Sequence, residues 1–181
     1  MRLFDLLLVT LITATLLAVV VVFHNDAMPY PVKAPPASVE AVQARPWAGI
    51  WVHSSGAPKG SLRSLEAAHA ERGGAPFHFV IGNGTETADG QVEQGPRWVS
   101  QLPGLNREVI EICLIGQIDR EKPTRKQQAA LETLCARLCR ERLVPSSEVC
   151  AESEKKRGVA CPGRFFDAVG TRAAVANLLA K

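Results

Sequence analysis

Short apolar runs that alternate with turn-forming residues predict the strands of this chain. The runs at 49–53 and 77–81 are each followed by a loop rich in Gly, Ser or Asn, and a shorter run covers 91–94. Residues 109–115 are largely apolar at successive positions, which is typical of a strand buried on both faces. We therefore predict four strands, with 109–115 in the centre of the sheet.

Helical spacing of apolar residues predicts the elements between and after these strands. A helix is expected over 61–72, with Ser61 as its N-cap and a glycine pair as its stop. Another begins at Pro123 and continues to about Arg142, and a third closes the chain over 172–180, after a short helical stretch at 165–169. Strands interleaved with helices predict an α/β or α+β layer fold.

The N-terminal part of the chain has a different pattern. Residues 6–23 carry no charge and approach the roughly 20 residues that cross a bilayer. Arg2 precedes this run, and Asp26 follows it, which favours the N-terminus in the cytoplasm and the domain outside. We expect a single transmembrane helix, an uncleaved signal anchor; a cleaved signal peptide is the alternative.

The expected organisation therefore has three parts. Residues 1–26 form the membrane anchor, and residues 27–46, which contain five prolines, form an extended linker. Residues 47–181 form one domain, a usual size for a chain with its own core. The protein is expected in the cell membrane, with this domain facing the periplasm or cell envelope.

Charge and cysteine content restrict the function further. The net charge of +3 and the lack of a long Lys/Arg stripe argue against a dedicated nucleic-acid binder. Five cysteines fit an exported protein weakly. Four of them could pair as disulfides or stay as small buried thiols, and both alternatives remain open: Cys113, Cys135, Cys139 and Cys150.

Two residues have the chemistry of a metal site. His53 ends the first strand, where a side chain can point into a cleft, and Cys161 precedes Pro162-Gly163 in a sharp turn. A fixed thiolate beside an imidazole suits zinc. A strand-end histidine with only a structural role is the alternative.

A series of motifs in one order gives these residues a family context. The series is Trp51-Val52-His53-Ser54-Ser55, His69, Phe77-His78-Phe79-Val80-Ile81-Gly82-Asn83-Gly84, Gly95-Pro96-Arg97-Trp98, Ile112-Cys113-Leu114-Ile115-Gly116, Pro123-Thr124 with Gln127, and Cys161-Pro162-Gly163. Over residues 47–169 the chain resembles the type 2 N-acetylmuramoyl-L-alanine amidases, which include peptidoglycan recognition proteins. The resemblance implies a mixed central sheet flanked by helices, and a zinc ion in an open groove. It also implies cleavage of the amide between N-acetylmuramic acid and L-alanine of peptidoglycan.

The resemblance implies a ligand set with one departure. The family's first zinc histidine falls on His53 and its cysteine ligand on Cys161. The second zinc histidine has no counterpart; Glu152 lies nearest the expected place, with Ser153 as the other choice. A His/Glu/Cys set is chemically reasonable for zinc. The alternative is that Glu152 is an ordinary surface acid and no zinc is bound.

Other positions of the family pattern are also changed. Phe77 stands where the family has its catalytic tyrosine, Cys113 where one branch has a glutamate, and Glu111 where the central strand has a glycine. The loop 101–106 is shorter than in the family and lacks its histidine.

The expected substrate-contacting residues are Phe77, His78, Arg97 and Trp98. For the last three, packing is the alternative. His69 is expected to pack or to form a hydrogen bond.

Two functions of different classes follow. The first is a zinc-dependent amidase acting on peptidoglycan, with His53, Glu152 and Cys161 as ligands. The second is a catalytically degenerate relative that binds peptidoglycan, or a partner protein, without cleaving it.

Overall fold

The computed structural model describes residues 46–181 of the chain. The predicted anchor, and the linker up to residue 45, lie outside the described residues. Within 46–181, no helix has both the length and the apolar character that a bilayer crossing requires.

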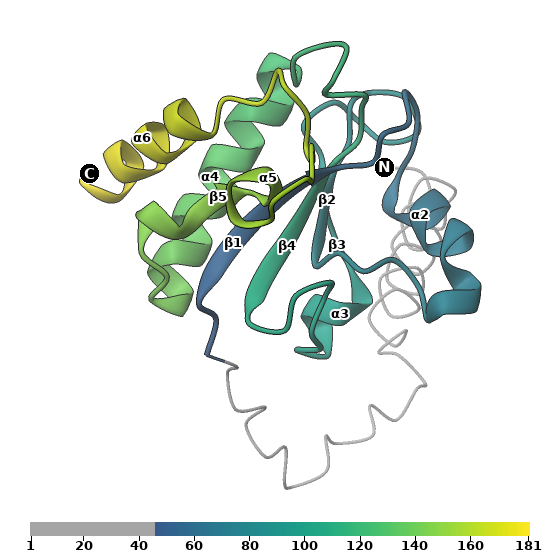
Figure 1. Cartoon of the computed structure of the whole chain (residues 1–181), viewed down its shortest axis with the longest axis horizontal. Coiled ribbons are helices and arrows are strands. Elements are labelled where there is room, and N and C mark those ends of the chain that lie inside the picture. Colours follow the sequence, from purple (N-terminus) through teal and green to yellow (C-terminus); the bar gives the residue numbers. More distant parts are fainter. Residues whose placement is uncertain (1–45) are drawn as a thin grey trace, which may run out of the picture. The chain divides into compact units, whose positions relative to one another are not determined.

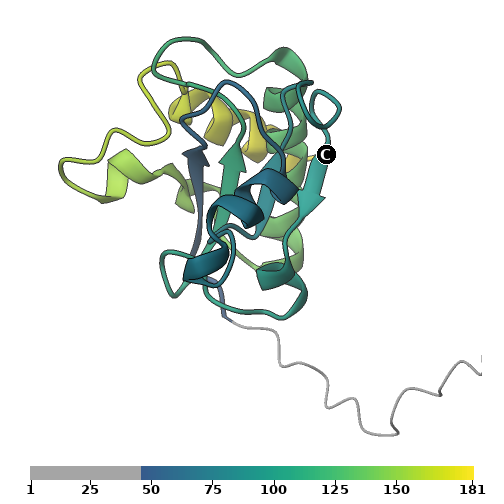
Figure 2. The same ribbon diagram turned by 90° about the vertical axis from the view of Figure 1, so that its right-hand side faces the viewer.

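One five-stranded sheet forms the centre of the domain, with the strand order β3-β2-β4-β1-β5. Its strands are β1 (Gly49–Ser54), β2 (Phe79–Ile81), β3 (Val92–Gln94), β4 (Val109–Leu114) and β5 (Val149–Ala151). Strands β2, β4, β1 and β5 are parallel to one another, and β3 pairs antiparallel with β2 at the edge. Figure 2 shows β1 and β4 side by side, pointing the same way. The sheet is therefore mixed, and β4 occupies its centre as predicted.

Helices lie on both sides of this sheet. They are α2 (Leu62–Ala68), α3 (Pro96–Val99), α4 (Arg125–Arg142), α5 (Glu152–Lys155) and α6 (Ala168–Leu179), with the 3-10 turns η1 (Ala70–Arg72) and η2 (Ser146–Glu148). In Figure 1, α4 and α6 lie together on the left, and α2 lies on the right. The predicted cap of α2 is present, because Ser61 accepts the backbone N–H of Ser64. Thr124, which was not predicted as a cap, accepts the backbone N–H of Gln127 at the start of α4.

Strand alternation divides the core into two parts. Ile50 and Val52 of β1, with Ile110 and Ile112 of β4, pack against α4 and belong to the larger cluster. Cys113 of β4 lies in a smaller cluster with Phe77, Val80 and Ile115, beside Leu62 and Leu65 of α2. Because side chains alternate along a strand, His53 and Glu111 face away from the α4 side. The site thus lies on the sheet face that does not hold the main core.

Several predicted boundaries were wrong. The expected helix 61–72 is interrupted at His69, so it forms α2 and then η1. The strand expected over 77–81 begins only at Phe79. The last helix begins at Ala168, and β5, α3 and α5 were not predicted at all; each has only three or four residues, too few to show a period.

The structure bears on the open question about the cysteines. All five thiols are free, and four of them are buried: Cys113, Cys135, Cys139 and Cys150. Burial raises the pKa of the Cys113 and Cys135 thiols, so they stay neutral. This arrangement agrees with small apolar thiols rather than with disulfides.

Candidate metal centre

Strand β1 carries the first residue of the candidate site. His53 pairs in register with Cys113 of the central strand, and it is only 2% exposed. Two ring nitrogens of this buried imidazole face different groups. Its Nε2 contacts the Glu111 carboxylate, and its Nδ1 faces the carboxylate of Glu152.

The other two residues come from the C-terminal third of the chain. Glu152 is the first residue of α5, directly after Ala151, which pairs with Val52 of β1. This pairing brings the start of α5 to the carboxyl end of β1. Cys161 is held nearby because the Ser153 N–H donates to the Cys161 carbonyl over 2.9 Å. The Ser54 hydroxyl donates to the next carbonyl, that of Pro162, over 2.7 Å.

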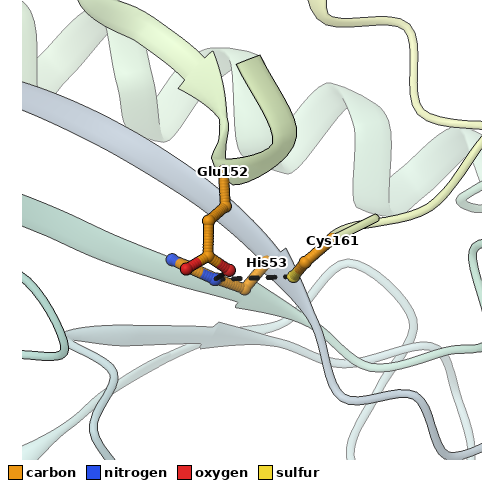
Figure 3. A group of neighbouring side chains, drawn as sticks. All are labelled: His53, Glu152 and Cys161. Atoms are coloured by element: carbon orange, nitrogen blue, oxygen red, sulfur yellow. Dashed lines mark hydrogen bonds and ion pairs between the residues drawn. The ribbon is translucent and has the colours of Figure 1, made fainter. Parts of the chain in front are cut away.

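These three side chains converge, as Figure 3 shows. His53 Nδ1 lies 3.1 Å from Glu152 Oε2 and 3.5 Å from Cys161 Sγ. One ligand atom from each residue lies within 4.8 Å of the others. The donors come from three separate segments, yet they surround one point.

The charges around His53 have a clear effect. Burial disfavours the charged imidazole, but hydrogen bonds to Cys161 and Glu111 outweigh it, and the pKa of His53 rises from 6.5 to about 9. Burial acts to raise the pKa of Glu152, but the hydrogen bond from Lys156 and the charge of His53 lower it overall. Lys156 Nζ contacts Glu152 Oε1 over 2.8 Å and leaves Oε2 facing His53.

The residues present fit a divalent zinc ion. Imidazole nitrogen, carboxylate oxygen and thiolate sulfur are all established zinc donors, and three protein ligands leave one position open for water or substrate. The carboxylates of Glu111 and Glu152 and the sulfur of Cys161 surround the buried His53 imidazole, and together they favour a positive charge at this point. A bound cation would be stabilised there for the same reason. The predicted ligands His53, Glu152 and Cys161 are thus brought together, and Glu152 does not point to solvent: it is 8% exposed.

The residues expected to contact substrate lie outside the His53, Glu152 and Cys161 group and contact other parts of the protein. Phe77 is buried, and its ring lies 5.5 Å from that of His53 between centroids. His78 has no exposed surface; its Nε2 donates to the Leu102 carbonyl, and its Nδ1 accepts the Glu111 N–H.

Trp98 and Arg97 likewise contact the protein itself. The Trp98 ring packs against Trp47 and Phe79 in the main core. The Arg97 guanidinium donates to the carbonyls of Ala75 and Pro103. For His78, Arg97 and Trp98, this structure agrees with the packing alternative. His69 Nδ1 bonds to the Leu65 carbonyl, which fits its expected role.

Sequence reasoning gave no role in the site to three residues beside the candidate metal centre: Glu111, Asn106 and Lys156. Glu111 is fully buried, and both N–H groups that reach its Oε1 come from Asn106. Lys156 lies between Glu152 and the Trp51 ring, 5.6 Å from the ring centroid. A carboxylate between Ile110 and Ile112 in an apolar strand was the available signal for the first of these.

Comparison with known proteins identifies the fold family. The sequence profile Amidase_2, N-acetylmuramoyl-L-alanine amidase, matches residues 43–164. The chain belongs to this family. The matched segment contains His53, Glu152 and Cys161, so the candidate metal centre lies within the family domain. No curated protein matches the chain.

Solved structures share the fold at low identity. The amidase LysC from Clostridium intestinale URNW is 22% identical over 74% of this chain and 87% of its own, with a TM-score of 0.62. Drosophila PGRP-LB is 23% identical over 67% of this chain and 78% of its own, with a TM-score of 0.53. Peptidoglycan recognition protein-LE is 20% identical, covering 70% and 85%, with a TM-score of 0.52. The predicted mixed sheet flanked by helices is confirmed.

Proposed function

We propose that this protein is a zinc-dependent amidase that cleaves the amide between N-acetylmuramic acid and L-alanine of peptidoglycan. The observation that supports the proposal is the convergence of His53 Nδ1, Glu152 Oε2 and Cys161 Sγ within 4.8 Å. Family membership supplies the substrate class, and the similar solved structures include N-acetylmuramoyl-L-alanine amidases. The carboxylate of Glu152 would take the place of the family's second histidine.

Each of the three side chains would hold the ion from a fixed position. When bound, zinc supplies an activated water and polarises the scissile carbonyl. His53 is fixed by its contact with Glu111, and Glu152 by its ion pair with Lys156. Cys161 is fixed through the backbone contacts of its segment with Ser153 and Ser54. Lys156, about two-fifths exposed, presents a positive charge beside the centre, where substrate carboxylates would be attracted.

A second candidate function is muropeptide binding without cleavage. The change at Phe77 favours it, since a phenyl ring has no hydroxyl to donate to a developing oxyanion. Peptidoglycan recognition protein-LE, which shares the fold, was solved in complex with tracheal cytotoxin, a monomeric diaminopimelic acid-type peptidoglycan. The amidase and the binder differ in whether the amide is broken, so one assay on purified muropeptide separates them.

The zinc content of the purified full-length protein tests the metal centre. We expect about one zinc per chain, and loss of that zinc in Glu152→Ala, because one of three ligands is removed. Glu148→Ala is the matched control: this carboxylate lies nearby but pairs with Lys155 at the surface. Zinc in neither the wild type nor the control would contradict the metal centre.

Release of stem peptide from muropeptide then tests catalysis. The zinc-loaded wild type should release peptides that begin with L-alanine, and Glu152→Ala should not. If the zinc-loaded protein binds muropeptide but releases no peptide, the second candidate replaces the first.

The cellular location is part of the same proposal. Residues 6–23 would anchor the protein in the membrane, with the domain in the periplasm or cell envelope, where peptidoglycan is found. Tethering raises the effective concentration of the domain near its substrate. Protease treatment of intact spheroplasts should digest the domain; complete protection would refute this orientation.

A further inference from the structure

Glu111 is a buried carboxylate in the centre of the sheet. It has no exposed surface and lies between Ile110 and Ile112, whose side chains pack on the opposite face with the α4 core. A carboxylate in such a place is strongly destabilising unless hydrogen bonds satisfy its oxygens. Its partners therefore show what it does in the fold.

Both carboxylate oxygens of Glu111 are engaged, each by a different part of the chain. Oε1 accepts the backbone N–H and the side-chain Nδ2–H of Asn106, each over 2.7 Å. Oε2 contacts Nε2 of His53. The carboxylate thus links the loop 101–106 to the histidine of the candidate metal centre.

This arrangement determines which nitrogen of His53 carries a proton. A carboxylate only accepts hydrogen bonds, so Nε2 must be the donor toward it. A neutral imidazole then has its lone pair on Nδ1, which is the atom that faces Glu152 and Cys161. Metal-binding histidines are commonly oriented by a carboxylate on their other nitrogen.

We infer that Glu111, supported by Asn106, is a positioning residue that holds His53 with Nε2 protonated and Nδ1 directed at the metal ion. The inference rests on the proposed zinc function and deepens it. It assigns a role to the residue that replaces the glycine of the family's central strand. It also explains the loop 101–106, which delivers the two N–H groups of Asn106.

The loop reaches Glu111 through a close approach of its backbone. A Cβ at Gly104 would lie 2.5 Å from Glu111 Cγ and 2.6 Å from the Pro76 carbonyl oxygen. His78 supports the same approach, because its Nε2 donates to the Leu102 carbonyl and its Nδ1 accepts the Glu111 N–H. The shortened loop, the buried histidine and the carboxylate therefore form one connected network under His53.

Substitution Glu111→Gln tests the inference with little change of volume. A glutamine has one acceptor oxygen and one donor NH2 group, so it can satisfy Asn106 or His53 Nε2–H, but not both. We expect the zinc dissociation constant, measured by competition with a chelator, to rise about 10–100-fold. Glu108→Gln, an exposed carboxylate just before β4, is the control and should bind like the wild type.

An NMR measurement separates positioning from a merely structural role. In the zinc-loaded wild type, long-range ¹H–¹⁵N spectra should show His53 protonated at Nε2 and unprotonated at Nδ1. This signature should be lost or altered in Glu111→Gln. A role in folding alone would lower the melting temperature of the zinc-free protein but leave both the spectrum and the zinc affinity of the folded fraction unchanged.

A milder variant covers the case in which Glu111→Gln does not fold. Asn106→Ala removes one of the two N–H groups at Oε1 and should weaken zinc binding roughly 2–10-fold. Wild-type zinc affinity in every folded variant of Glu111 and Asn106 would overturn this inference and leave the proposed function intact. Failure of the wild type to bind zinc would overturn both.

Discussion

Folding stability of the zinc-free protein should fall as the pH rises from about 6.5 to about 9. The cause is His53, whose pKa is raised in the folded protein from 6.5 to about 9 by its hydrogen bonds to Cys161 and Glu111, which outweigh burial. Below pH 6.5 the imidazole is protonated in both the folded and the unfolded chain, and this stabilisation is fully present. Between the two values only the folded protein holds the proton, so each rise in pH favours unfolding.

The magnitude follows from the interval between the two pKa values. At about 1.4 kcal/mol per pH unit, an interval from 6.5 to about 9 corresponds to about 3 kcal/mol. This is a large share of the 5–15 kcal/mol that is typical of whole domains, as an order of magnitude. The effect is not reduced much by solvent, because His53 is only 2% exposed.

Denaturant unfolding of the chelator-treated protein in detergent can measure this effect. The buried Trp47 and Trp98 provide a fluorescence signal for unfolding. Curves at pH 6 and pH 8.5 should differ in the free energy of unfolding by about 2–3 kcal/mol for the wild type. His53→Gln, which removes the titrating group, should lose most of this difference. Equal pH dependence in the two proteins would refute the reasoning.

Two further substitutions test individual contacts within the domain. Gln127→Leu removes an amide that donates to the buried carbonyls of Ile81 and Ile115, over 3.0 and 2.8 Å. We expect the free energy of unfolding, measured with urea, to fall by about 1–3 kcal/mol. An unchanged value would contradict the role of this amide in joining β2 to the end of β4. Gly104→Ala places a methyl group 2.5 Å from Glu111 Cγ. We expect it to lower the free energy of unfolding by about 1–3 kcal/mol and to weaken zinc binding. A fully stable variant with normal zinc affinity would show that the close approach of the loop backbone to Glu111 is not needed.

Periodicity predicted the longer elements because they bury a regular face. The helix α4 could be located from Leu131, Leu134 and Leu138, all buried in the structure, and its start was predicted from Pro123, two residues before its first residue, Arg125. The three-residue strand β5 and the four-residue α5 are too short to show a period. Their position depends on pairing with β1, a contact between residues about 100 apart that local sequence does not encode.

The candidate ligands could be named from the sequence, but their support could not. Glu152 was found from its distance to Cys161 in the family pattern, and the structure brings its carboxylate to His53. Glu111 was noticed only as a departure from a glycine. Its role requires knowledge of which strand face it shares with His53, and of the loop that brings Asn106 to it.

The alternation of side chains in β1 and β4 has a consequence for how this protein can evolve. On these two strands, the side chains that pack against α4 and those of His53 and Glu111 occupy opposite faces. A substitution of His53 or Glu111 therefore leaves the side chains of the main packing layer unchanged. Selection can in this way act on the chemistry of one sheet face separately from the packing of the other face.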